Sequence, residues 1–152
     1  MGSADIDVDF AGGAALLMPY GTSIHELKDR GRVKPGGVVL VLGEAGGVGL
    51  AAVEQAKAYG ARVIAAVSTA AKADVARTAG ADDVVIYGRA PFDKAQSKAL
   101  AEAFKAACGP GGADIVFDLV GGDYSAPPLP AIARAGRVPV VGSPPRTARL
   151  PP

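Results

Sequence analysis

The segment from Val38 to Leu50 carries the clearest chemical signal in the sequence. An apolar run, Val38–Leu42, leads into Gly-Glu-Ala-Gly-Gly-Val-Gly and then into alanine-rich chain. A strand, a glycine-rich turn and a helix in this order present backbone N–H groups and a positive helix end to a nucleotide pyrophosphate. Gly46 stands where the pyrophosphate approaches the backbone, and Gly49 where helix and strand pack closely. We predict dinucleotide binding here; the alternative is a tight turn without a ligand.

Glu44 departs from this glycine pattern, because it occupies the position of the first glycine. A carboxylate about 4 Å from the pyrophosphate would cost roughly 4 kcal/mol at an intermediate dielectric, which is close to a thousandfold in affinity. The cost largely disappears when the side chain points away from the ligand. We therefore expect Glu44 to turn toward solvent.

The end of the second predicted strand indicates which dinucleotide binds. Proteins that bind NAD place Asp or Glu about 20 residues after the glycine loop, where it holds the ribose 2′-hydroxyl. Residues 63–73 contain no acid and offer Ser68, Thr69 and Lys72 instead. Hydroxyl and ammonium groups suit a 2′-phosphate, so the segment favours NADP. The alternative is that Thr69 only caps the next helix and Lys72 is a solvated helix residue.

Other residues with chemical potential receive weaker assignments. Glycine-containing turns at 121–122 and 142–143 follow later strands, where open α/β sheets bind ligands, although plain turns would look the same. His25 has no nucleophile or acid at the spacing of a catalytic triad, so we expect it at the surface. Cys108 ends a helix and receives no role. With one Cys and one His, the usual zinc ligand sets cannot be assembled, and we expect no metal site.

These residues need a scaffold, which the spacing of apolar residues and turn signals predicts. The expected helices span Phe10–Leu17, Ser23–Arg30 (after an interruption at Pro19 and Gly21), Gly47–Tyr59, a segment capped by Thr69, Pro91–Ala107 and Pro127–Ala135. The expected strands span Val38–Leu42, Ala61–Val67, Asp83–Tyr87, Asp114–Leu119 and Arg137–Val141. Their alternation predicts an α/β, Rossmann-type doubly wound parallel sheet of about five strands in the order 3-2-1-4-5, without a sixth strand. Pro139 falls inside the last strand, which indicates an edge strand or a bulge.

The whole chain, 1–152, is expected to be a single dinucleotide-binding domain. Residues 1–34 form a helical lead-in, 35–143 the core and 144–152 a proline-rich tail. A net charge of +1 gives no reason to expect nucleic acid or a membrane as partner. Because neither a signal peptide nor a long apolar segment is visible, we expect a cytoplasmic protein.

Seven segments together resemble a known family. They are Pro19–Thr22, Leu27–Gly31, Leu42–Gly49, Gly60–Ala65, Gly80–Asp82, Val116–Tyr124 and Gly136–Gly142. In them the chain resembles the nucleotide-binding half of zinc-independent medium-chain dehydrogenases/reductases of the quinone oxidoreductase family. The resemblance implies that NADPH binds between this domain and a GroES-like domain that this sequence lacks. It further implies hydride transfer from NADPH to a quinone or enone without a metal, and a homodimer or a partner domain.

The resemblance also assigns residues to parts of the cofactor, but none to catalysis. It places Gly46, Gly47 and Val48 at the pyrophosphate, Ser68, Lys72 and Tyr87 at the 2′-phosphate, and Thr22, Val120, Gly142 and Ser143 toward the nicotinamide. The chain departs from the family pattern at Glu44 and in the additional prolines 128, 130 and 139. Two alternatives stay open: a non-enzymatic NADPH-binding module or truncated remnant that needs a partner chain, and a methyltransferase that uses S-adenosylmethionine. The methyltransferase would need an acid at the end of the second strand, which Val67-Ser68 does not supply.

Overall fold

The computed structural model describes residues 10–43 and 46–141. Within them, five strands form one parallel sheet in the order β3-β2-β1-β4-β5, as predicted. The strands are β1 (Val38–Leu42), β2 (Arg62–Val67), β3 (Asp83–Ile86), β4 (Ala113–Asp118) and β5 (Ile132–Arg137). The helices are α1 (Phe10–Ile24), η1 (His25–Arg30), α2 (Gly47–Ala58), α3 (Ala70–Thr78), α4 (Lys94–Cys108), η2 (Gly122–Tyr124) and η3 (Leu129–Ala131).

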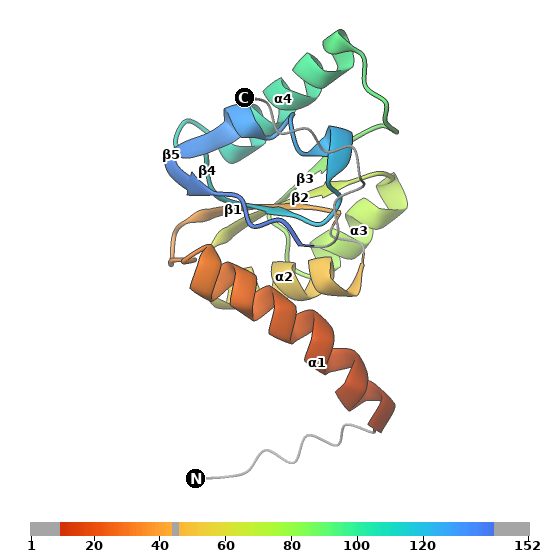
Figure 1. Cartoon of the computed structure of the whole chain (residues 1–152), viewed down its shortest axis with the longest axis vertical. Coiled ribbons are helices and arrows are strands. Elements are labelled where there is room, and N and C mark those ends of the chain that lie inside the picture. The colour runs from red at the N-terminus through yellow and green to blue at the C-terminus, as the bar shows by residue number, and fades with distance from the viewer. Residues whose placement is uncertain (1–9, 44–45, 142–152) are drawn as a thin grey trace.

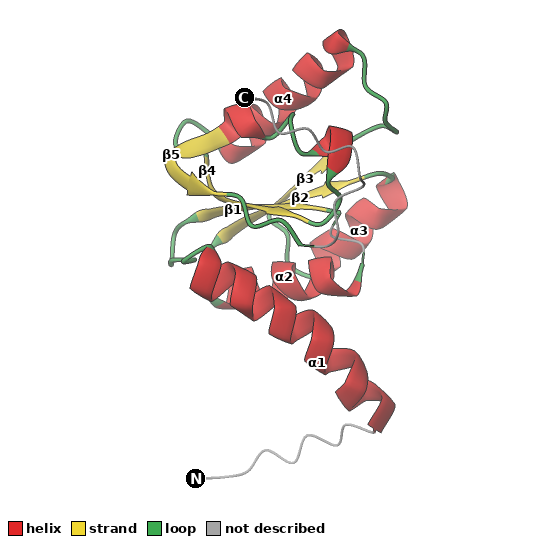
Figure 2. Ribbon diagram, viewed as in Figure 1, coloured by secondary structure: helices red, strands yellow, loops and turns green. Residues whose placement is uncertain are grey.

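Both faces of the sheet are covered, which explains why its strands are almost continuously apolar. Helices α1, α2 and α3 lie on one side of the sheet and α4 on the other (Figures 1 and 2). Alternate residues of β1 serve the two sides: Val39 and Val41 pack with residues of α2, and Leu40 and Leu42 pack with residues of α4. The central strand β1 is therefore held firmly, and its end fixes the position of Gly43.

The structure confirms the predicted start of the helix at Thr69 and shifts the one predicted near Pro91. The Thr69 hydroxyl accepts a hydrogen bond from the Lys72 backbone N–H at 3.3 Å and caps α3, as predicted. Helix α4 begins at Lys94, a turn later than expected, because Asp93 and Gln96 form a reciprocal capping box with bonds of 2.7 and 3.0 Å.

The predicted break at Pro19 and Gly21 is wrong. Helix α1 runs without interruption from Phe10 to Ile24, and a π-helical turn, η1, continues it to Arg30. Proline in a helix interior removes one hydrogen bond and disfavours the helix locally. Here α1 packs along α2, and this tertiary contact outweighs the local preference.

The predicted helix Pro127–Ala135 is also wrong, and the strand after it begins earlier than expected. Residues 127, 128 and 130 are prolines and donate no backbone hydrogen bond, so only the short turn η3 forms. Strand β5 then starts at Ile132. Its pairing with β4 is irregular, because Ala113 pairs with Ile132 while Ile115 pairs with Arg137.

Pro139 lies in the chain that follows β5, at the edge of the sheet, as its missing N–H predicts. Its carbonyl oxygen accepts a hydrogen bond from the Asp118 N–H at 2.9 Å. Between Arg137 and Val141, where the described chain ends, the ladder is reduced to one isolated bridge, between Asp118 and Val140. The expected edge position is thus present, but the predicted strand Arg137–Val141 is wrong, because β5 ends at Arg137 and Pro139 lies beyond it.

In the two described ranges, no helix combines the length and the apolar character needed to cross a membrane.

Candidate functional site

The candidate site lies at the carboxyl end of β1, between the loops that follow β1 and β4. Gly43 directly follows β1 with φ of +75°, and its N–H donates to the Ala66 carbonyl at 3.1 Å. A Cβ on Gly43 would lie 2.6 Å from Cγ2 of Val120, so the two loops touch at this point. Because β1 separates the two halves of the sheet, this is the switch point where open α/β sheets bind ligands. Sequence reasoning assigned Gly43 no role, although a glycine directly after an apolar strand was the available signal.

The first turn of α2 opens onto this end of the sheet. Gly46 is the N-cap residue, with extended backbone, and its carbonyl accepts from the Leu50 N–H at 3.0 Å. Gly46 and Gly47 are exposed, and among the described residues other than its chain neighbours, none has an atom within 4 Å of where a Cβ on Gly46 would be. The N–H groups of a first helical turn have no acceptor within the helix, so they can bind an anion. Gly49 is buried in α2, as its expected packing role requires.

The three residues assigned to a 2′-phosphate come from neighbouring elements at the carboxyl ends of the strands. Ser68 follows β2 and is half-buried, Lys72 is exposed on α3, and Tyr87 follows β3 and is half-buried. The Tyr87 N–H donates to the Val67 carbonyl at 2.8 Å, so the ends of β2 and β3 are held together. The Thr69 hydroxyl serves α3 as its cap, which confirms the structural interpretation of that residue.

An aromatic cluster supports the Tyr87 loop from the α4 side. The Tyr124 ring centroid lies 5.1 Å from that of Tyr87 and 5.1 Å from that of Phe92. The Tyr124 hydroxyl also accepts a hydrogen bond from the Ala90 N–H at 2.8 Å. These contacts hold the chain that follows β3 against the turn that follows β4.

Asp118 organises the loop after β4, a role that sequence reasoning missed. Its side chain is fully buried at the carboxyl end of β4. One carboxylate oxygen accepts from the N–H groups of Val120 and Gly121, both at 2.9 Å, and the other accepts from the Ser125 hydroxyl. An acid that closes an apolar strand was the signal in the sequence. Asp118 thereby fixes Val120, which the family resemblance places toward the nicotinamide.

Thr22 lies in α1 and is half-buried, next to the fully buried Ser23. The Ser23 hydroxyl lies 2.8 Å from the Val48 carbonyl oxygen, so this part of α1 is held at the first turn of α2. The remaining sequence-predicted positions, Gly142, Ser143 and the Glu44 side chain, lie outside the described residues.

Residues that the sequence left without a role stand apart from this site. His25 is exposed, with Nδ1 3.0 Å from the Asp29 carboxylate, as expected for a surface residue. Cys108 is buried, and burial raises the pKa of its thiol to about 11. Among the described side chains, no three of His, Cys, Asp or Glu gather into a group that could hold a metal ion.

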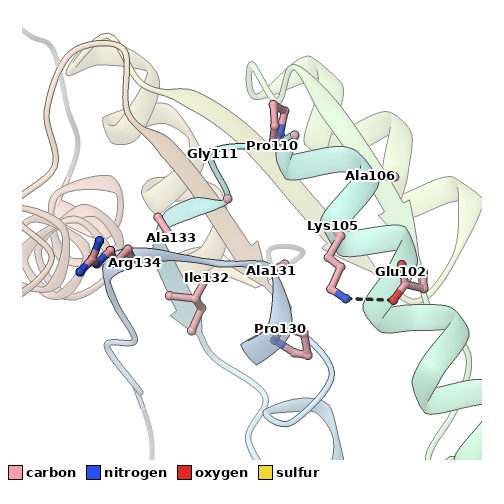
Figure 3. A pocket seen from close by; sticks show the side chains of 12 residues that line it. Glu102, Lys105, Ala106, Pro110, Gly111, Pro130, Ala131, Ile132, Ala133 and Arg134 are labelled. Atoms are coloured by element: carbon pink, nitrogen blue, oxygen red, sulfur yellow. Dashed lines mark hydrogen bonds and ion pairs between the residues drawn. The ribbon is translucent and has the colours of Figure 1, made fainter.

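A groove of about 770 Å³ lies at the amino ends of the strands, opposite the candidate site, between the end of α4 and the start of β5 (Figure 3). Lys105 projects from α4 there and is paired with Glu102 at 3.0 Å, while Arg134 projects from β5. The groove borders the amino ends of β4 and β5, and open α/β sheets bind ligands at the carboxyl ends. We therefore do not assign the cofactor to this groove.

Comparison with known proteins supports the same assignment of the fold. Residues 47–152 match the family described as zinc-binding dehydrogenases. Quinone oxidoreductase-like protein 2 of Bos taurus is 38% identical over 130 residues, which are 85% of this chain and 35% of the relative. Quinone oxidoreductase of Homo sapiens is 32% identical over 136 residues, 90% of this chain and 39% of the relative. A mycobacterial protein solved with NADPH superposes with a TM-score of 0.82 at 34% identity, over 99% of this chain and 43% of that chain. The chain thus spans little more than a third of the curated relatives it matches.

Proposed function

Because this chain belongs to the zinc-binding dehydrogenase family and resembles its quinone oxidoreductases, we propose that it is the NADPH-binding domain of such an oxidoreductase. The whole enzyme would transfer a hydride from NADPH to a quinone or a small enone, without a metal. Family membership leaves no support for the methyltransferase alternative.

The observation that carries this proposal is the open first turn of α2. Apart from its chain neighbours, no residue that the structure describes fills the place of a side chain on Gly46, and Gly47 is exposed beside it. A diphosphate needs this access to backbone N–H groups, and the N-terminal end of a helix favours its negative charge. A related mycobacterial protein was solved with NADPH, which supports the same ligand for this chain.

The choice of NADPH over NADH rests on the ends of β2 and β3. Residues 63–73 supply no carboxylate for a ribose 2′-hydroxyl. Ser68 and Lys72 supply a hydroxyl and an ammonium group instead, and Tyr87 lies on the neighbouring strand end. Such groups stabilise a phosphate by charge-assisted hydrogen bonds.

The residues of this chain would bind and orient the cofactor rather than carry out the reaction. NADPH supplies the hydride when it is bound. The amides of α2 would hold the pyrophosphate, and the loop fixed by Asp118 would place Val120 beside the nicotinamide half. The acceptor also has to be enclosed and oriented. Most of the rate enhancement that positioning can provide depends on this step. We assign that task to protein outside this chain, a further domain or a second chain.

A second candidate function is a non-enzymatic NADPH-binding module that acts with a partner chain. In its favour, the residues that we assign at this site would hold the cofactor, and none of them is assigned to the acceptor. Mixing the purified chain with NADPH and a benzoquinone tests the module. Oxidation of NADPH above the uncatalysed rate contradicts it and supports the oxidoreductase, whereas binding without turnover is expected of both functions, because the acceptor would be enclosed by protein outside this chain.

Calorimetric titration with NADPH and NADH tests the cofactor assignment. We expect tighter binding of NADPH, and Lys72→Ala should weaken NADPH about fivefold while leaving NADH unchanged, as for one exposed charge-assisted bond. Lys98→Ala is the matched control, because Lys98 is an exposed lysine on α4, on the other side of the sheet. Equal affinity for the two cofactors in the unmodified chain would contradict the assignment.

A further inference from the structure

Ser23 is a fully buried hydroxyl between two helices, and no role has yet been assigned to it. Its Oγ lies 2.8 Å from the Pro19 carbonyl oxygen within α1 and 2.8 Å from the Val48 carbonyl oxygen in α2. A hydroxyl carries one hydrogen, so the two carbonyls share a single donor. Ser23 thus ties a turn of α1 to the first turn of α2.

Neighbouring contacts show that the Ser23–Val48 bond lies at the end of the α1–α2 pair that is nearest the candidate site. Pro19 packs at the start of α2, where a Cβ on Gly47 would lie 3.5 Å from its ring. Farther along α2, the Gln55 side-chain amide donates to the Tyr20 carbonyl at 3.0 Å, and the Tyr20 hydroxyl donates to Glu54. The bond from Ser23 is the one of these links that reaches the first turn, where the pyrophosphate amides lie.

We propose that Ser23 is a positioning residue, which fixes the first turn of α2 against α1. It would thereby set the spacing between the amides that hold the pyrophosphate and Thr22, its neighbour in the chain. This inference rests on the proposed function for the identity of the ligand. The link between the two helices does not depend on the proposed function, because it is present in the free protein.

A positioning role and a general stabilising role predict different responses to two ligands. NADPH spans the first turn of α2 and the nicotinamide end. Adenosine 2′-monophosphate has no pyrophosphate and would contact only the end of the site that contains Ser68 and Lys72. Loss of the Ser23 link should therefore weaken the binding of NADPH and leave the binding of adenosine 2′-monophosphate unchanged.

The test compares Ser23→Ala with Thr78→Ala, in titrations with both ligands followed by NMR. Thr78 is the matched control, because its hydroxyl donates to the Asp74 carbonyl one turn back at 2.9 Å, on the exposed side of α3. We expect Ser23→Ala to lower the affinity for NADPH about fivefold, the effect of one net hydrogen bond. The affinity for adenosine 2′-monophosphate should stay unchanged. Ser23→Cys keeps a weak donor and should recover part of the affinity. Thr78→Ala should change neither ligand.

Amide hydrogen exchange on the ligand-free protein provides the second measurement. The Leu50 N–H, bonded to the Gly46 carbonyl at 3.0 Å, should exchange about fivefold faster in Ser23→Ala. The Tyr59 N–H, bonded to the Gln55 carbonyl at 2.9 Å at the other end of α2, should keep its rate.

An unchanged Leu50 exchange rate overturns the inference, and so does an equal loss of affinity for both ligands. Faster Leu50 exchange without weaker NADPH binding also overturns it. If the unmodified chain binds neither ligand, the proposed function is wrong, and Leu50 exchange still decides whether Ser23 holds the two helices together.

Discussion

Replacing Gly43 with alanine tests the contact between the loops that form the candidate site. Gly43 has φ of +75°, and a Cβ there would lie 2.6 Å from Cγ2 of Val120. A left-handed backbone costs a non-glycine residue about 1–2 kcal/mol, and overpacking costs about 1–3 kcal/mol. Alanine also restricts the unfolded chain, which offsets about 0.4–1 kcal/mol. We therefore expect Gly43→Ala to lower the free energy of unfolding by about 1–5 kcal/mol.

The chain provides a matched control for the backbone term. Gly36 has φ of +77°, and no described residue beyond its chain neighbours lies within 4 Å of the position of its Cβ. Gly36→Ala therefore carries the strain without the clash. Urea denaturation of both variants should show Gly43→Ala to be the less stable by about 1–3 kcal/mol, the size of the overpacking term.

A double variant identifies the atom responsible. Val120→Ala removes the methyl group that the new Cβ would meet, so the destabilisation by Gly43→Ala should shrink to that of Gly36→Ala in its presence. If Gly43→Ala proves as stable as Gly36→Ala, or if Val120→Ala leaves its effect unchanged, the two loops do not meet as described.

Three other perturbations follow from groups around the sheet. Asp118→Ala leaves two loop N–H groups without their acceptor, so we expect a loss of about 2–4 kcal/mol in urea denaturation; a loss below about 0.5 kcal/mol would contradict the role of Asp118. Burial raises the pKa of Cys108 to about 11, so the thiol should react with Ellman's reagent at pH 8 only after unfolding, and prompt reaction of the native chain would refute its burial. Burial raises the pKa of Asp82, but hydrogen bonds from Lys57 and from the Val63 N–H outweigh it and lower the pKa. Its stabilisation is therefore present above about pH 4 and lost as pH falls through the lowered value, so Asp82→Asn should lower the Tm at pH 7, and this effect should shrink as the pH falls below 4.

Local patterns in the sequence predicted most of the fold. The bounds of β1 and the Thr69 cap agree with the structure because each depends on neighbouring residues, an apolar run or a hydroxyl at a helix start. The strand order follows from the right-handed crossovers that alternating strands and helices impose.

The predictions failed where local and tertiary effects oppose each other. Pro19 signals a break, yet α1 continues through it because α1 packs on α2. At 127–130 the prolines prevail, and the expected helix is reduced to η3. The alternation of strands and helices favours a helix in this place, but the prolines there supply no N–H donors to it.

The parts of the site also differed in how far sequence could predict them. The glycine loop and the Ser68–Lys72 segment are contiguous motifs, so their positions could be predicted. The links through Asp118 and Ser23 depend on how loops and helices meet in space. Ser23 and Val48 are 25 positions apart, and no local pattern connects them.

The central claim, that NADPH binds at the first turn of α2, is tested most directly by two-dimensional NMR of the ¹⁵N-labelled chain during titration with NADPH. We predict that the amide signals of Gly46, Gly47 and Val48 shift, together with that of Lys72. Signals of Gly111 and Gly112, in the groove at the amino ends of the strands, should stay in place. Shifts confined to that groove, or no shifts at saturating NADPH, would contradict the account.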